Sequence, residues 1–296
     1  MAARTARAAS PRMLAVWLVA PSLILAIAVI GYPLFEIARL SLSSVSRFGQ
    51  IRGFVGLDNF GTIASDPIFR AALVRTLLWT LLVVGGTLIT SLPAALVLNR
   101  PFYGRGLART IVMLPWAISL SMSAIVWLWS FNGDHGLINA SLTKLGLLSG
   151  PLQWMATPVT AFAVEVLVGI LVSVPFTITI LLGGLAAINP DIYEAAGLDG
   201  ARPYQAFAFL TWPLLRPFIA IAVVLNTIYV FNSFPIIWVM TQGGPDNGTH
   251  ILVTYLYELA FRLGRPGPAA AVSLVMLVIV LGVTAIYLRM QGKEAA

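Results

Sequence analysis

Side chains able to do chemistry are few in this 296-residue chain, and some of them share one face of a predicted helix. Glu165, Ser173 and Phe176 recur with helical spacing in the apolar segment 159–187, on one stripe with Gly169. An ionisable group in such a helix is costly unless it faces a bundle interior or water. The stripe therefore predicts a polar path, with an acid near its outer end and a hydroxyl near its middle.

A second stripe lies in the segment 213–240, where Asn226, Val230 and Ser233 follow at helical spacing and Tyr229 adjoins them. Amide, hydroxyl and aromatic groups are suited to binding a polyol in transit. The same small polar groups also join helices to one another inside a membrane. The sequence leaves both interpretations open, and the first predicts that these residues line a solute pathway.

Catalysis is disfavoured by the residues that the sequence lacks. The chain has no cysteine, and neither of its two lysines, Lys144 and Lys293, follows the glycine spacing of a phosphate-binding loop. His135 and His250 have no helical pairing and no nearby pair of carboxylates, so we expect surface groups rather than a metal site. A membrane-embedded enzyme is therefore the weakest hypothesis, and we expect no metal or cofactor on this chain.

The composition describes a protein that resides in lipid. Hydrophobic residues make up 59% of the chain, charged residues only 10%, and the mean hydropathy is +0.91. Six apolar runs are each long enough to span a membrane. They predict an all-α polytopic membrane protein with helices at about 13–37, 76–98, 109–131, 159–187, 213–240 and 268–288. These helices form one transmembrane domain, 13–290, between short tails at 1–12 and 291–296.

Orientation follows weakly from the basic residues. With the amino terminus inside, ten lysines and arginines fall in cytoplasmic segments and eight outside. We therefore expect both termini in the cytoplasm. The net charge of +7 forms no basic cluster, which argues against binding to nucleic acid.

A polar island at 189–212 separates two of the predicted spans. Asn189 is placed to cap a short helix, which we expect Gly197 and Gly200 to break. Asp199 would then cap a second short helix, which Pro213 and Pro217 end at the membrane edge. Elsewhere, we expect an interfacial helix that ends near Arg75, just before the second span.

This island carries a family motif. Residues 194–201 read E-A-A-G-L-D-G-A and residues 210–217 read L-T-W-P-L-L-R-P, which resembles the EAA loop of importer permeases in the ATP-binding cassette class. The likeness is nearest to sugar permeases of the maltose and glycerol-phosphate type. It implies the type I importer permease fold and a cytoplasmic loop that docks into an ATPase subunit. The residues that would make this contact are Glu194, Ala195, Ala196, Gly197, Asp199 and Gly200.

Other segments extend the resemblance. The motif T-x-G-G-P at 241–245 is similar to an outer loop of these permeases, which implies that Gly243, Gly244 and Pro245 meet a binding protein. Further family-like stretches occur at 54–60, 114–118 and 136–139. Aligned on the EAA loop, the sugar-site positions of the maltose permease fall on Ser173, Phe176, Asn226, Val230 and Ser233. Two of these, Val230 and Ser233, stand where that relative has asparagines, so the polar lining is thinner.

The resemblance therefore implies a non-catalytic permease subunit that forms half of a sugar pathway in a bacterial inner membrane. Its implied partners are a second permease chain, two ATPase subunits that hold ATP and Mg, and an extracytoplasmic solute-binding protein. An ion-coupled secondary transporter is the alternative. That class needs coupling-ion sites and often an inverted repeat, for which the single acid Glu165 is poor support.

Overall fold

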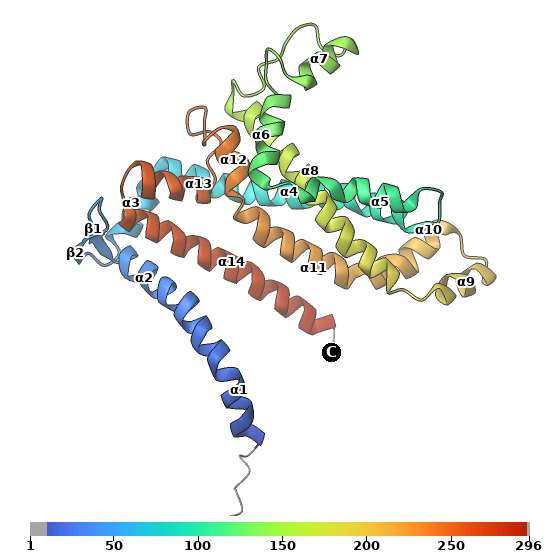
Figure 1. Ribbon diagram of the computed structural model, residues 1–296, viewed down its shortest axis with the longest axis horizontal. Helices are drawn as coiled ribbons and strands as arrows, with labels where there is room; N and C mark the ends of the chain where they lie inside the picture. The colour runs from blue at the N-terminus through green and yellow to red at the C-terminus, as the bar shows by residue number, and fades with distance from the viewer. Residues whose placement is uncertain (1–10, 295–296) are drawn as a thin grey trace, which may run out of the picture. The chain divides into compact units, whose positions relative to one another are not determined.

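The computed structural model describes residues 11–294, and nearly all of them lie in helices or in the turns between helices (Figure 1). The chain divides into two compact units. One contains the residues up to Ser65 together with Leu259–Val275, and the other contains Asp66–Glu258 and the chain from Met276 onward. The two stripes predicted above lie in the second unit.

The first unit consists of one long helix with a π turn, a two-stranded antiparallel hairpin and a short helix. Its elements are α1 Pro11–Ala26, η1 Ile27–Gly31, α2 Tyr32–Ser41, β1 Ser43–Val45, β2 Ile51–Phe54 and α3 Asp58–Ser65. Asn59 fixes the base of the hairpin, because its amide donates to the carbonyls of Ser41 at 2.8 Å and Ser43 at 2.9 Å. The family-like stretch 54–60 thus has a structural role here.

The second unit holds the remaining helices. They are α4 Pro67–Asn99, α5 Arg105–Met113, η2 Leu114–Ala117, α6 Leu120–Ser130, α7 Leu137–Lys144, α8 Pro158–Ala186, α9 Pro190–Leu198, α10 Pro203–Ala206, η3 Phe207–Thr211, α11 Trp212–Phe231, α12 Phe234–Met240 and α13 Leu252–Tyr257. The π turn η4 Glu258–Arg262 and the helix α14 Pro266–Glu294 each have residues in both units. Helix α14 continues into the predicted tail 291–296, whereas the predicted tail 1–12 lies almost wholly outside the described residues.

Helices α4, α8 and α11 pack together around Trp79. This side chain is fully buried, and its indole nitrogen donates to the Val230 carbonyl at 2.9 Å. Gly169 on α8 leaves room for the ring, since a Cβ there would lie 2.9 Å from an indole carbon. The three helices therefore form a closely packed frame for the site described below.

A pair of adjacent glycines on α8 allows a test of this packing. A Cβ on Gly184 would lie 2.5 Å from the Phe218 ring, whereas one on Gly183 would meet nothing of the described chain within 4 Å. Overpacking a buried contact costs about 1–3 kcal/mol. We expect Gly184→Val to lower the thermal unfolding midpoint of the detergent-solubilised protein and Gly183→Val to leave it near wild type. Equal midpoints for the two variants would contradict close α8–α11 packing.

The membrane spans agree with the sequence in number. Among residues 11–294, five helices are long and apolar enough to cross a membrane, and a bent pair of helices makes a sixth when it is counted as one span. The predicted all-α fold with about six spans is thereby confirmed.

The predicted helix 109–131 is wrong as a single element. It is that bent pair, with Arg105–Ala117 and Leu120–Ser130 at 97° to each other. Pro115 lies in a short 3₁₀ turn, and Ser119 then caps a new helix by accepting from the Met122 backbone at 3.3 Å. The bend sets the direction in which the tryptophan of this turn points.

The predicted helix 213–240 is also interrupted. Its main part ends at Phe231, and α12 begins after Asn232 and Ser233. Pro235 has no N–H to donate to the Phe231 carbonyl, so the helical hydrogen bond that would bridge this point cannot form.

At two other places the helix continues through a residue where its end was predicted. No helix ends near Arg75, because α4 begins at Pro67, capped by Asp66, and runs on to Asn99. Nor does a helix end at Pro213, since the helical span Pro203–Phe231 passes through it by way of the π turn η3. The wide π turn alters the hydrogen-bond register just before the proline.

Candidate functional site

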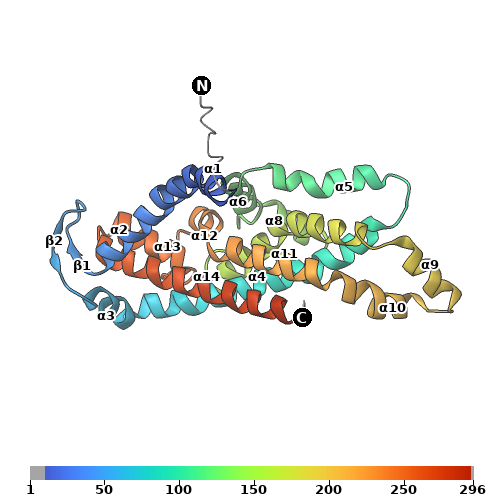
Figure 2. The same cartoon turned by 90° about the horizontal axis from the view of Figure 1, so that it is seen from below.

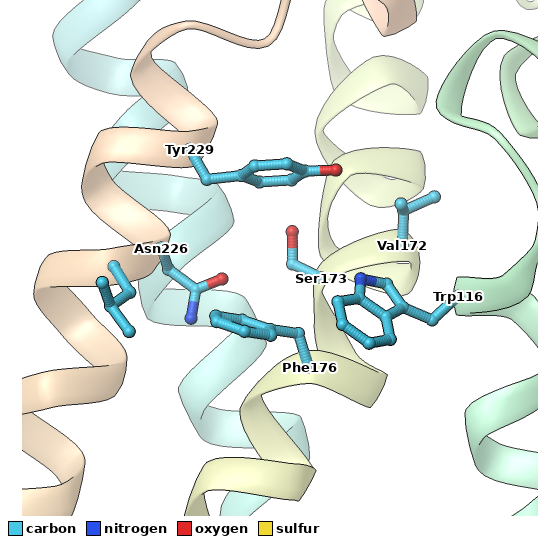
Figure 3. A pocket seen from close by; sticks show the side chains of 7 residues that line it. Trp116, Val172, Ser173, Phe176, Asn226 and Tyr229 are labelled. Carbon is cyan, nitrogen blue, oxygen red and sulfur yellow. The ribbon is translucent and has the colours of Figure 1, made fainter. Parts of the chain in front are cut away.

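A cavity of about 190 Å³ lies between η2, α8 and α11 (Figure 3). It is lined by Trp116, Val172, Ser173, Phe176, Leu225, Asn226 and Tyr229. None of these seven side chains carries a charge at neutral pH. The site therefore favours hydrogen bonds and contacts with aromatic faces over ion pairing.

Asn226 supplies the most distinctive polar group of the cavity. Its amide nitrogen donates to the Thr177 hydroxyl at 2.9 Å and to the Ala222 carbonyl at 2.8 Å. Its amide oxygen is buried and has no hydrogen-bond partner within residues 11–294, and Figure 3 shows it directed toward Ser173. An unmade hydrogen bond of this kind costs free energy, so the oxygen is an unpaired acceptor just behind the surface of the cavity.

Aromatic rings form two sides of the cavity. Trp116 and Phe176 lie with their ring centres 5.8 Å apart and tilted by 32°, and Tyr229 lies across the cavity from them (Figure 3). The Ser173 hydroxyl between them donates to the Gly169 carbonyl at 2.8 Å, which leaves its oxygen able to accept. A few placed polar groups among aromatic and apolar walls are typical of a small-molecule site.

The cavity brings together four of the seven residues predicted to line a pathway: Ser173, Phe176, Asn226 and Tyr229. Val230 lies in the apolar core, with 2% of its surface exposed. Ser233 is buried at the break between α11 and α12. Glu165 is also buried, and it hydrogen-bonds to Thr241 rather than lining the cavity.

The island 189–212 forms two short helices at the end of α8 and α11 that lies away from α12 (Figure 1, Figure 2). The predicted cap is confirmed, since Asn189 accepts from the Asp191 backbone at 3.0 Å. Gly197 does not break α9 but lies within it, and the exit is made by Gly200 with φ of 77°. Asp199 ends α9 instead of capping the next helix, which follows Arg202.

Most of the predicted coupling residues are open to a partner. Glu194, Ala195, Gly197, Asp199 and Gly200 are exposed, and Ala196 is half-buried. The Tyr193 hydroxyl lies 3.0 Å from the Thr211 hydroxyl, which joins α9 to the start of the following span. The exposed face is therefore held on a helix and connected directly to α11.

The segment 241–250 forms a tight loop after α12. Gly243 adopts φ of 87° and packs on the buried His250, leaving no space for a side chain. The prediction that His250 is a surface group is thus wrong, because this loop closes over it. Of the predicted docking residues, Gly243 is buried, and Gly244 and Pro245 are half-buried.

Comparison with known proteins places these features in one family. Residues 86–293 match the family described as "Binding-protein-dependent transport system inner membrane component". This chain belongs to that family. The permease is 56% identical in sequence to a probable ABC transporter permease protein of Brucella suis, over 96% of this chain and 98% of the relative.

Relatives with named solutes are more distant. The sulfoquinovosyl glycerol transport system permease protein SmoG of Agrobacterium fabrum is 35% identical, over 94% of this chain and 90% of the relative. The trehalose/maltose transport system permease protein MalF of Thermococcus litoralis is 35% identical, over 92% and 91%. The permease fold is matched by a crystal structure of a bacterial alginate ABC transporter, with a TM-score of 0.82, 22% identity, and coverage of 95% of this chain and 94% of that chain.

Family membership decides between the two transporter hypotheses. The chain is the inner-membrane permease component of a binding-protein-dependent ABC importer rather than an ion-coupled transporter. The permease family is not itself catalytic, which agrees with the reading of the sequence. Sequence reasoning missed three lining residues, Trp116, Val172 and Leu225. Of these, Trp116 follows a proline in a family-like stretch, which was a usable signal.

Proposed function

We propose that this permease forms half of the pathway of an ATP-driven importer for a neutral sugar or sugar-like polyol. The uncharged cavity with the unpaired acceptor oxygen of Asn226 beside it supports this proposal most strongly. The relative named for trehalose/maltose transport supports a neutral sugar, whereas the relative named for sulfoquinovosyl glycerol, a sugar sulfonate, supports only a sugar-like solute. A strongly acidic solute is disfavoured, because none of the lining side chains would neutralise its charge.

The size of the cavity fits this solute class. A volume of about 190 Å³ equals that of roughly six water molecules in the liquid. This is enough for about one sugar ring, and a second permease chain would complete the site for anything larger. In this proposal Ser173, Phe176, Asn226 and Tyr229 bind the solute, and Trp116 joins them.

The remaining parts of the importer would be separate chains. Two ATPase subunits would bind ATP and Mg and would meet the exposed face of α9 around Glu194 and Gly197. A solute-binding protein would dock on the loop around Gly243, Gly244 and Pro245. The coupling loop and the docking loop lie at opposite ends of α11, as this arrangement requires (Figure 1). Both termini would lie in the cytoplasm, because an even number of spans returns the chain to the side on which it starts.

The test begins with the solute-binding protein encoded beside this permease. Its melting temperature is measured with a panel of neutral sugars, polyols and acidic sugars, and each ligand found is used to stimulate ATP hydrolysis by the reconstituted complex. We expect a neutral sugar or polyol to raise both the melting temperature of the binding protein and the rate of ATP hydrolysis. Stimulation by acidic sugars alone would contradict the proposed solute class, and uptake that persists without ATP would contradict the importer.

A further inference from the structure

Glu165 is a fully buried acid whose hydrogen-bond partner lies at the start of the outer loop. Its side chain is 0% exposed, and one carboxyl oxygen accepts from the Thr241 hydroxyl at 2.7 Å. The other oxygen has no partner in the described part of the chain. A buried acid is costly to keep in an apolar helix, which calls for a reason beyond packing.

The hydrogen bonds continue from Thr241 across the loop. The hydroxyls of Thr241 and Thr249 lie 2.6 Å apart, and because Thr241 gives its proton to Glu165, Thr249 is the donor between them. The Gly244 carbonyl lies 2.9 Å from the same Thr249 hydroxyl. The Gly243 backbone N–H lies 3.2 Å from the Thr241 oxygen, which can accept from it. The carboxyl of α8 is thereby connected to both ends of the loop that carries the glycines.

The exposed part of this loop is strained. Gln242, Asp246 and Asn247 have φ of 53°, 51° and 57°, in the left-handed region. Asparagine and aspartate tolerate this region better than glutamine does, and the shape persists only where its surroundings hold it. The three are also the exposed residues of the loop, so a partner would meet the surface that the network keeps in place.

We propose that Glu165 is a positioning residue for the docking of the solute-binding protein. Through Thr241 and Thr249 it holds the outer loop in the shape that the binding protein recognises, an inference that rests on the docking role proposed above. Glu165 precedes Ser173 on α8 by eight residues, about 12 Å along the helix. The docking loop and the wall of the cavity are therefore attached to the same helix.

The test is a titration of the complete reconstituted importer with its sugar-loaded binding protein, with ATP hydrolysis as the readout. We expect Glu165→Leu to raise the half-saturating concentration of binding protein about tenfold, the effect of losing one buried hydrogen bond, and to retain the rate at saturation. Glu165→Gln keeps an acceptor oxygen and should stay within about twofold of wild type.

Threonine variants keep the test decisive if Glu165→Leu fails to assemble. Thr241→Val should reproduce the tenfold rise, and adding Glu165→Leu to it should cause little further change, because both remove the same contact. The matched control is Thr87→Val, a buried threonine on α4 whose hydroxyl has no partner in the described residues. This control should leave the titration unchanged.

Three results would overturn the inference. The first is an unchanged half-saturating concentration of binding protein in both Glu165→Leu and Thr241→Val. The second is a rise of this concentration in Glu165→Gln that equals the rise in Glu165→Leu. The third is a lower rate at saturation with unchanged half-saturation, which would place Glu165 in the pathway instead. Failure of the proposed function is distinguishable, because then the wild-type complex itself shows no stimulation by the binding protein.

Discussion

Gly197→Asp is expected to abolish solute import while the permease remains folded in the membrane. Gly197 lies inside α9 and is exposed, and a Cβ there would meet no atom of the described chain within 4 Å. The substitution should therefore leave α9 intact and place a negative charge on the face proposed to meet the ATPase. An unpaired charge buried in an interface costs about 3–5 kcal/mol, so import should fall more than about 100-fold.

The measurement is ATP-driven uptake into proteoliposomes, together with recovery of the ATPase subunits on the purified permease. Glu194→Lys should cause a similar loss, because it reverses a charge on the same face. The matched control is Gly106→Asp on α5, another exposed helical glycine with open space around it in the described chain. Normal import by both Gly197→Asp and Glu194→Lys would refute the coupling role of α9.

Asn226→Leu is expected to lower import at least about tenfold at saturating binding protein. Leucine fills a similar volume but removes the unpaired acceptor oxygen and the donor to Thr177. Leaving a buried hydroxyl of the solute or of Thr177 without its hydrogen-bond partner costs about 1–3 kcal/mol. The binding protein should keep its affinity for the sugar, because the change lies in another chain.

Two variants distinguish a role of Asn226 in binding solute from a role in the contact between α8 and α11. Thr177→Val removes the hydrogen bond between α8 and α11, together with one inside α8 to the Ser173 carbonyl, and should retain most of the import. Asn232→Leu, at the exposed end of α11, controls for the loss of an asparagine. If Thr177→Val lowers import as strongly as Asn226→Leu, or if Asn226→Leu lowers only the thermal midpoint, Asn226 is an interhelical contact rather than a solute ligand.

Local chemistry predicted the start of the coupling segment but not its later boundaries at Gly197, Asp199 and Pro213. Asn189 followed by Pro190 is a strong start signal, and the structure begins α9 there. The ends of spans were less predictable, because hydropathy identifies the part of a helix that lies in lipid rather than the whole helix. Helix α4 therefore begins at Pro67 and includes Arg75, well before its apolar run.

The site was predictable only in part, for a physical reason. Helical spacing placed Ser173 with Phe176 and Asn226 with Tyr229, and the structure brings these four into one cavity. The contribution of Trp116 depends on the bend of 97° between two helices, and the burial of His250 depends on the loop over it. Both are tertiary features that a periodic pattern in one segment does not contain.

The helical span from Pro203 to Phe231 begins shortly after α9, the helix proposed to meet the ATPase, and carries the cavity residue Asn226 toward its other end. Asn226 lies 23 residues beyond Pro203, about 35 Å along the axis. Reciprocity then applies to the two ligands: if the nucleotide changes the affinity for solute at Asn226, the solute changes the affinity for nucleotide by the same factor. A complex with an empty pathway would thus bind nucleotide with a different affinity from a complex whose pathway holds solute.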